Sequence, residues 1–169
     1  MLNYFSIFDI GGDDINNPEE YGLKTTEFVS CQSPYPMDCE SISRPGPELP
    51  VGFNAHCMSR IGNLVILSGA LGSGIPTDNR EVDTLVVDIS NNFTMTYGPK
   101  MIESRFSHSC GSIYHNGKTY MIVSGGFSID TDDELATTEL WDPTSDEGWI
   151  EGIFSVYFIY NCFVSKFHQ

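Results

Sequence analysis

The sequence contains few basic residues. Its 169 residues include 8 Lys and Arg against 23 Asp and Glu, which gives a formal net charge of −15 at pH 7. Nucleic acids and anionic membrane surfaces bind through clustered Lys and Arg, so we expect neither as a partner. A basic protein or a cation is the more natural counterpart, and a merely solvated acidic surface is the alternative.

A signal-peptide pattern and an apolar run long enough for a membrane-spanning helix are also lacking. Residues 1–10 (MLNYFSIFDI) have no charged start followed by an apolar run and a small-residue cleavage site, so no signal peptide is predicted. A cytoplasmic location is favoured, and secretion stays open if the N-terminus is truncated. Residues 153–169 begin with an apolar, aromatic run that is shorter than the roughly 20 residues of a membrane-spanning helix. We interpret this tail as an artefactual terminus, an extra strand or a membrane anchor.

The cysteines lack the spacing of a metal site. Their number is odd and no CxxC pair occurs, so no zinc site is indicated. We expect buried or free thiols, and a bridge between Cys31 and Cys39 is the alternative for a secreted protein. The glycosylation triplet Asn92-Phe93-Thr94 has a meaning only in the secretory pathway. The five cysteines are Cys31, Cys39, Cys57, Cys110 and Cys162.

Motifs of catalysis and cofactor binding are lacking as well. The Gly-rich residues 69–80 do not have the spacing of a phosphate loop, and no Lys-Ser/Thr pair follows them. The calcium-loop pattern of an EF-hand does not occur, and no catalytic triad can be proposed from spacing. We therefore predict no enzymatic activity, no cofactor and no metal.

Turn-forming residues are abundant, with 16 Gly and 9 Pro, and they divide residues 101–142 into short segments. Strands are predicted at residues 108–114, 119–123 and 137–141. Asn116-Gly117 separates the first two segments and is the strongest short signal for a hairpin. Strands separated by turn signals about every 8 to 12 residues predict an all-β domain.

The same unit recurs along the chain. Residues 46–56 align without a gap on residues 98–108, from Gly-Pro to His, at an offset of 52 residues. A glycine pair recurs, with one substitution, at Gly11-Gly12, Gly69-Ala70 and Gly125-Gly126. A period near 50 residues with a glycine pair is typical of propeller blades. By this alignment we also expect strands at residues 1–10, 25–31, 53–59, 64–67, 84–88 and 93–96, and an irregular, proline-rich loop at residues 33–50.

The last unit resembles a kelch repeat. The resemblance is carried by Arg105, His108, Asn116-Gly117-Lys118, Tyr120, Gly125-Gly126, the ELWDP of residues 139–143 and Trp149, which marks a fourth strand. It covers about 150 residues and is weaker in the earlier units, where Ala70 and Phe93 stand for the second glycine and the tryptophan.

The resemblance implies an all-β fold, a fragment of a kelch-type β-propeller with four-stranded antiparallel blades. The blades would be residues 1–45 (incomplete), 46–97 and 98–152, with residues 153–169 outside the repeat. A propeller typically needs four to eight blades to close, so we expect a piece of a longer protein.

The histidines fit the repeat better than a metal site. His56 and His108 occupy equivalent positions. This repetition favours a structural role inside a blade, such as a hydrogen bond between strands, over metal coordination. His115, beside the Asn-Gly turn, is expected to be solvated.

The resemblance implies binding of a partner protein through loops at the blade ends. Loops at residues 13–24, 72–80 and 127–135 follow the glycine pairs, so we expect them to gather on one end. The candidate partner-binding residues are Asp13, Asp14, Asp130, Asp132, Asp133 and Glu134. Because a fold does not determine a function, a galactose-oxidase-like enzyme fragment and the substrate-recognition propeller of a ubiquitin-ligase adaptor stay as alternatives.

Overall fold

The computed structural model describes residues 4–9, 26–31, 41–50, 52, 56–69 and 83–152. Within these ranges the chain forms antiparallel strands and no helix, so the predicted all-β class is confirmed. No described helix is long and apolar enough to cross a membrane. The chain divides into two compact units, residues 1–54 with 72–75 and residues 55–71 with 76–169.

The first unit contains a three-stranded antiparallel sheet. β1 (Tyr4–Asp9) pairs with β2 (Thr26–Cys31), and β2 pairs with β3 (Ser41–Pro45). The strands expected at residues 1–10 and 25–31 are therefore present. The expectation of an irregular loop over residues 33–50 is wrong at β3. Because β3 is an edge strand and Pro45 is its last residue, the proline does not interrupt the ladder.

The second unit begins with a four-stranded antiparallel sheet in the order β4-β5-β6-β7. Its strands are β4 (Cys57–Ile61), β5 (Leu64–Ser68), β6 (Thr84–Asp88) and β7 (Thr94–Tyr97). A two-residue turn joins β4 to β5, with Ile61 paired to Leu64 and a positive φ of 60° at Gly62. Glycine adopts that backbone conformation without steric cost, so the turn and the register follow from the local sequence.

The other four-stranded sheet has the order β13-β12-β10-β9. Its strands are β9 (Ser109–His115), β10 (Lys118–Ser124), β12 (Thr138–Trp141) and β13 (Ile150–Glu151). At the predicted hairpin, Asn116 and Gly117 have φ values of 49° and 81°. Two positive φ angles are the signature of a type I′ turn, which matches the twist of the flanking strands.

All eight strands expected for these two sheets are present, with ends shifted by a few residues. Residues 53–55, at the start of the predicted strand 53–59, lie outside the described residues. A further two-stranded ribbon was not anticipated. It pairs β8 (Arg105–Phe106) with β11 (Phe127–Ser128), and two residues per strand are too few to produce a periodic pattern.

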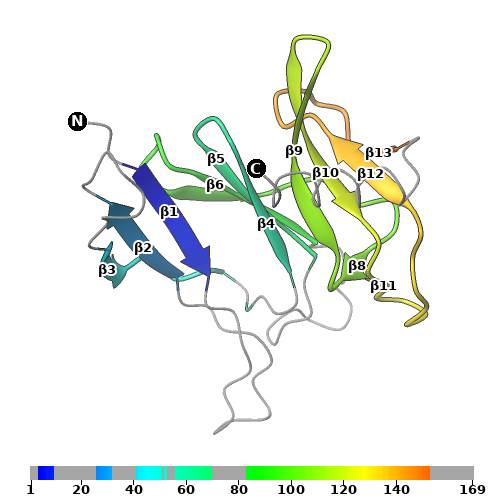
Figure 1. The fold of residues 1–169 in the computed structure, drawn as a ribbon, viewed down its shortest axis with the longest axis horizontal. Helices are drawn as coiled ribbons and strands as arrows, with labels where there is room; N and C mark the ends of the chain where they lie inside the picture. Colours follow the sequence, from blue (N-terminus) through cyan, green and yellow to red (C-terminus); the bar gives the residue numbers. More distant parts are fainter. Residues whose placement is uncertain are drawn as a thin grey trace, which may run out of the picture. The chain divides into compact units, whose positions relative to one another are not determined.

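An apolar core holds the two four-stranded sheets together. The first strand of each sheet, β4 and β9, lie side by side (Figure 1). The buried cluster draws on both sheets and on the segment between them: Ile61, Ile66, Met101, Met121, Val123, Trp141 and Trp149. Each fully buried side chain of this size contributes about 1.5–3 kcal/mol relative to exposure. Packing between the sheets is therefore a large part of the stability of this unit.

Candidate functional site

The predicted acidic loop follows β10, and a buried histidine organises the backbone where it begins. His108 packs against Gly69, which follows β5, and against Gly126, which follows β10. A Cβ atom on Gly69 would lie 2.5 Å from His108 Cε1, and one on Gly126 would lie 2.9 Å from His108 Cβ. Both glycines also have positive φ angles, 70° and 84°. Steric contact and backbone conformation therefore both require glycine at these positions.

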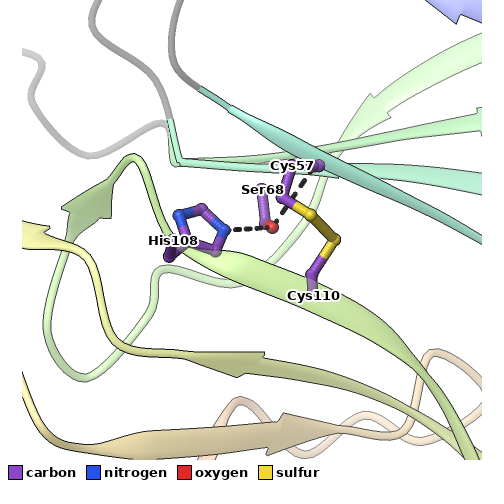
Figure 2. The surroundings of a disulfide bond; sticks show 4 residues. All are labelled: Cys57, Ser68, His108 and Cys110. Carbon is purple, nitrogen blue, oxygen red and sulfur yellow. Dashed lines mark hydrogen bonds between the residues drawn. A yellow bond between two sulfur atoms is a disulfide. The ribbon is translucent and has the colours of Figure 1, made fainter. Parts of the chain in front are cut away.

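His108 forms a hydrogen bond to the neighbouring sheet. Its Nε2 lies 2.8 Å from Ser68 Oγ, at the end of β5, and that hydroxyl also donates to the carbonyl of Cys57 (Figure 2). Burial, with the nearby positive charge of Arg105, lowers the pKa of His108 to about 4. The expected structural role is confirmed, but its placement inside one sheet is wrong, because the partner belongs to the adjacent sheet.

A disulfide joins the same two sheets beside this histidine. Cys57 on β4 and Cys110 on β9 are bonded, with their Cα atoms 5.8 Å apart (Figure 2). The expectation of free thiols is therefore wrong for this pair. Their separation of 53 residues is close to the 52-residue offset of the repeat, which puts them at similar heights on neighbouring first strands. Cys39 and Cys162 lie outside the described residues, and so does the alternative Cys31–Cys39 bridge.

Two buried carboxylates hold the segment that crosses from one sheet to the next. Asp83, just before β6, accepts hydrogen bonds from the Met101 amide at 3.0 Å and from Ser104 Oγ at 2.7 Å. Glu139, on β12, accepts from the amides of Ile102 and Glu103 at 2.7 and 3.0 Å. The crossing segment is therefore attached to both sheets by charged acceptors, which form stronger hydrogen bonds than neutral groups.

Arg105 completes this network from inside the protein. Its side chain is fully buried and pairs with Glu139 at 2.5 Å. The guanidinium also donates to the carbonyls of Gly125 and Thr137, at 3.0 and 3.1 Å. These carbonyls lie at the two ends of residues 126–136, which include the acidic loop. Arg105 thereby ties both ends of the loop to one buried charge, and planar multidentate donation is the chemistry that suits Arg to such a site.

The acidic loop is a closed, hydrogen-bonded structure. The Leu135 amide donates to the Gly126 carbonyl at 2.8 Å, and Phe127 forms an isolated antiparallel bridge with Glu134. Nearer the tip, the Ser128 amide donates to the Asp133 carbonyl at 2.9 Å. Asp132 adopts a φ of 61°, a conformation that Asp tolerates better than most residues. The loop therefore presents its side chains from a defined backbone.

The four predicted acidic residues of this loop all lie at the surface. Asp130, Asp132, Asp133 and Glu134 are exposed. Among the described residues, no group of three or more His, Cys, Asp or Glu side chains is placed to hold a metal ion. The loop is thus a local concentration of negative charge rather than a chelating cage in this structure.

Other acidic residues nearby are engaged in the fold. Asp142 accepts a hydrogen bond from Lys118 Nζ at 2.7 Å, and its Oδ1 accepts from the Thr144 amide at 2.9 Å. The hydrogen bond from Lys118, followed by those from Thr144, lowers the pKa of Asp142 to about 2. Asp142 therefore belongs to the connection that follows β12 and is not part of the candidate site.

Two phenylalanines form the base of the acidic loop. Phe127 on β11 stacks on Phe106 on β8, with ring centroids 5.6 Å apart. Phe127 is 36% exposed, so an apolar surface lies directly beside the acidic residues. Neither phenylalanine was among the predicted contact residues, although Phe127 lies in the predicted loop. The signal that could have identified Phe127 is its position, the first residue after the glycine pair and the first of the loop.

The remaining predicted site residues are not described. Asp13 and Asp14 lie outside the described residues, as do the loops at residues 13–24 and 72–80. The starting points of the second and third loops can still be compared, because Gly69 and Gly126 both contact His108. Residues after β5 and residues after β10 therefore leave from the same end of the two sheets.

A shallow groove lies at the other end of β6, away from the end of the sheets that contains His108. It has a volume of about 360 Å³, and its lining includes Asp88, Thr94, Tyr97, Trp141 and Pro143. Its polar groups already serve the local turn: Asp88 accepts from the Ser90 hydroxyl at 2.7 Å, and the Thr94 hydroxyl donates to the Asn91 carbonyl. The acidic loop remains the stronger candidate site.

No protein-family model matches the chain, and no curated protein matches it significantly.

Proposed function

We propose that this chain is part of a kelch-type β-propeller that binds a basic partner protein through the acidic loop of residues 127–135. The observation that carries the proposal is the combination of exposed carboxylates and exposed apolar surface on a loop anchored to the core. Two four-stranded antiparallel sheets, related by the sequence repeat and packed through a shared core, support the propeller part.

Charge supports a basic partner. From residue 119 to residue 152 the sequence contains nine Asp and Glu and no Lys or Arg. A surface of one sign accelerates the encounter with an oppositely charged partner and discourages others. Because the four loop carboxylates are exposed, this attraction is screened by salt over a distance of about 8 Å at physiological ionic strength.

Loop geometry supports a peptide-like contact. The Ser128–Asp133 hydrogen bond closes the tip of the loop, and the Leu135–Gly126 hydrogen bond closes its base. The loop backbone therefore needs little further ordering when a partner binds. Preformed loops lose less conformational entropy when they bind. Phe127 offers a place for one apolar side chain, and aromatic residues are common anchors in interfaces.

The proposal is tested by selecting displayed random peptides against the purified chain. We expect the enriched peptides to be rich in Lys and Arg. One enriched peptide is then titrated against a variant with Asp130→Asn, Asp132→Asn, Asp133→Asn and Glu134→Gln. Loss of four exposed ion pairs, each worth about 0.2–1 kcal/mol, is expected to weaken binding by about fourfold to several hundredfold.

A control variant neutralises three acidic residues elsewhere on the same unit. Asp146→Asn, Glu147→Gln and Glu151→Gln change exposed carboxylates that lie after β12, and we expect them to leave the peptide affinity nearly unchanged. If both variants weakened peptide binding equally, the loss of affinity would be due to net charge and not to the acidic loop. Selection of peptides without basic residues, or unchanged affinity of the loop variant, would overturn the proposal.

A further inference from the structure

The glycosylation triplet Asn92-Phe93-Thr94 begins in the connection between β6 and β7 and ends at Thr94, the first residue of β7. It is the only Asn-X-Ser/Thr triplet in the sequence. The Thr94 amide donates to the Asn91 carbonyl at 3.0 Å, and the two central residues have φ angles of 50° and 58°. These features define a tight, left-handed turn at the tip of the connection. The triplet therefore lies in a surface turn, as attachment of a bulky glycan requires.

The acceptor side chain is accessible in the folded protein. Asn92 and Thr94 are both exposed. Within residues 83–152, no hydrogen bond engages the Asn92 side chain, whereas the Thr94 hydroxyl donates to the Asn91 carbonyl at 2.6 Å. A glycan on Asn92 Nδ2 would consequently displace no interaction of the described fold.

The disulfide is a second, independent observation that indicates the same cellular route. Cys57 and Cys110 are bonded across two sheets. Disulfides of this structural kind form and persist in oxidising compartments and are rare in the cytosol. In the secretory pathway, the oxidising compartment in which disulfides form is also the one in which Asn-X-Ser/Thr triplets are glycosylated.

We propose that Asn92 is an N-glycosylation site and that this protein matures in the secretory pathway. The co-reactant is a lipid-linked oligosaccharide pyrophosphate. Asn92 Nδ2 forms a bond to the anomeric carbon of the sugar, the bond from that carbon to the pyrophosphate oxygen breaks, and the lipid pyrophosphate leaves with the electron pair. The amide nitrogen gives up one proton, and no oxidant or reductant is needed.

The position of the turn keeps a glycan away from the acidic loop. The residues after β5 and β10 leave from the end of the sheets that contains His108. The turn after β6 lies at the opposite end, because β6 runs antiparallel to β5. A glycan on Asn92 and a partner on residues 127–135 would therefore occupy opposite ends of this unit.

To test the proposal, the whole chain is expressed in animal cells with a cleavable secretory leader at its N-terminus. We expect the product to lose mass on treatment with peptide N-glycosidase, which converts the glycosylated Asn92 to Asp, and peptide mass spectrometry to locate that change. Asn92→Gln and Thr94→Ala should both abolish the glycan. Thr94→Ser, which preserves the triplet, and Asn91→Gln, which alters only the neighbour, should both retain it.

The Cys57–Cys110 bond is read in the same sample by mass spectrometry without reduction. A glycan on the disulfide-bonded product supports the proposal. A disulfide-bonded product without a glycan overturns it, and so does a glycan found only on chains in which Cys57 and Cys110 are unpaired. A variant that is poorly secreted is still informative, because the glycan and the bond can be measured in the cell lysate.

Discussion

His108 is buried, and its neutral form is the one that the fold accommodates. Burial lowers its pKa to about 4, against 6.5 for an unperturbed histidine. Between these values the unfolded chain binds a proton that the folded chain does not. The stabilising contribution is therefore complete above pH 6.5 and is lost as the pH falls towards 4.

We predict that the free energy of unfolding falls by at most about 1.4 kcal/mol per pH unit through this window because of His108. Urea unfolding at several pH values, compared between the wild type and His108→Gln, measures the effect. The variant should lose the part of the slope that His108 contributes, whereas His115→Gln, at an exposed position, should keep it. The comparison is necessary because Asp83 also makes stability depend on pH. Burial raises the pKa of Asp83, so its contribution to the free energy of unfolding weakens as the pH rises above 3.8. An identical slope in wild type and His108→Gln would contradict the assignment.

At Gly126, even replacement by alanine should lower the stability of the fold. A Cβ there would collide with the Phe106 carbonyl and with His108, and its φ is 84°. We predict that Gly126→Ala lowers the free energy of unfolding by about 2 kcal/mol or more. Gly111→Ala is the control, because a Cβ at Gly111 meets no atom within 4 Å. Thermal unfolding of both variants decides, and equal midpoints would show that the contact relaxes at little cost.

At the scale of the strands, the disulfide links β4 to β9, which belong to different sheets. We predict that Cys57→Ser lowers the free energy of unfolding by about 2–4 kcal/mol, since cross-linking restricts the unfolded chain. Cys110→Ser should have the same effect, and the double variant should be no worse than either single one. Reductant should bring the wild type to the level of the variants. Additive losses would indicate that the two side chains act independently.

The strands themselves were largely predictable. The hairpin at Asn116-Gly117 and the apolar segments on either side of it depend on residues close together in the sequence, so local turn chemistry and alternation suffice. The edge strand β3 was missed because the five prolines of residues 33–50 suggested a loop, and its pairing with β2 depends on a separate segment. Of the predicted contact residues, the four of the acidic loop are exposed as expected, whereas Phe127 was overlooked because its exposure follows from the β8–β11 pairing.

At the scale of the whole molecule, excess acidic charge makes copies of this chain repel one another at neutral pH. The net charge is −15 at pH 7, and the isoelectric point calculated from the sequence is about 4.3. We predict that light scattering rises as the pH approaches 4.3, where charge repulsion between molecules vanishes. His108→Gln separates this effect from loss of folding. If net charge governs aggregation, scattering should rise at the same pH in the wild type and in His108→Gln. If unfolding governed aggregation, the pH at which scattering rises would differ between the two proteins.

The sequence by itself determined the all-β class, the two four-stranded units and the position of the acidic loop, because alternation, turn residues and a period near 50 residues are local or repeating properties of the chain. Only the tertiary structure decided what happens between the sheets. His108 bonds to Ser68, Cys57 bonds to Cys110, and Arg105 joins Glu139. Each pair joins residues 34 to 53 positions apart. Such contacts depend on how neighbouring sheets approach one another, and that packing arises only in the folded chain.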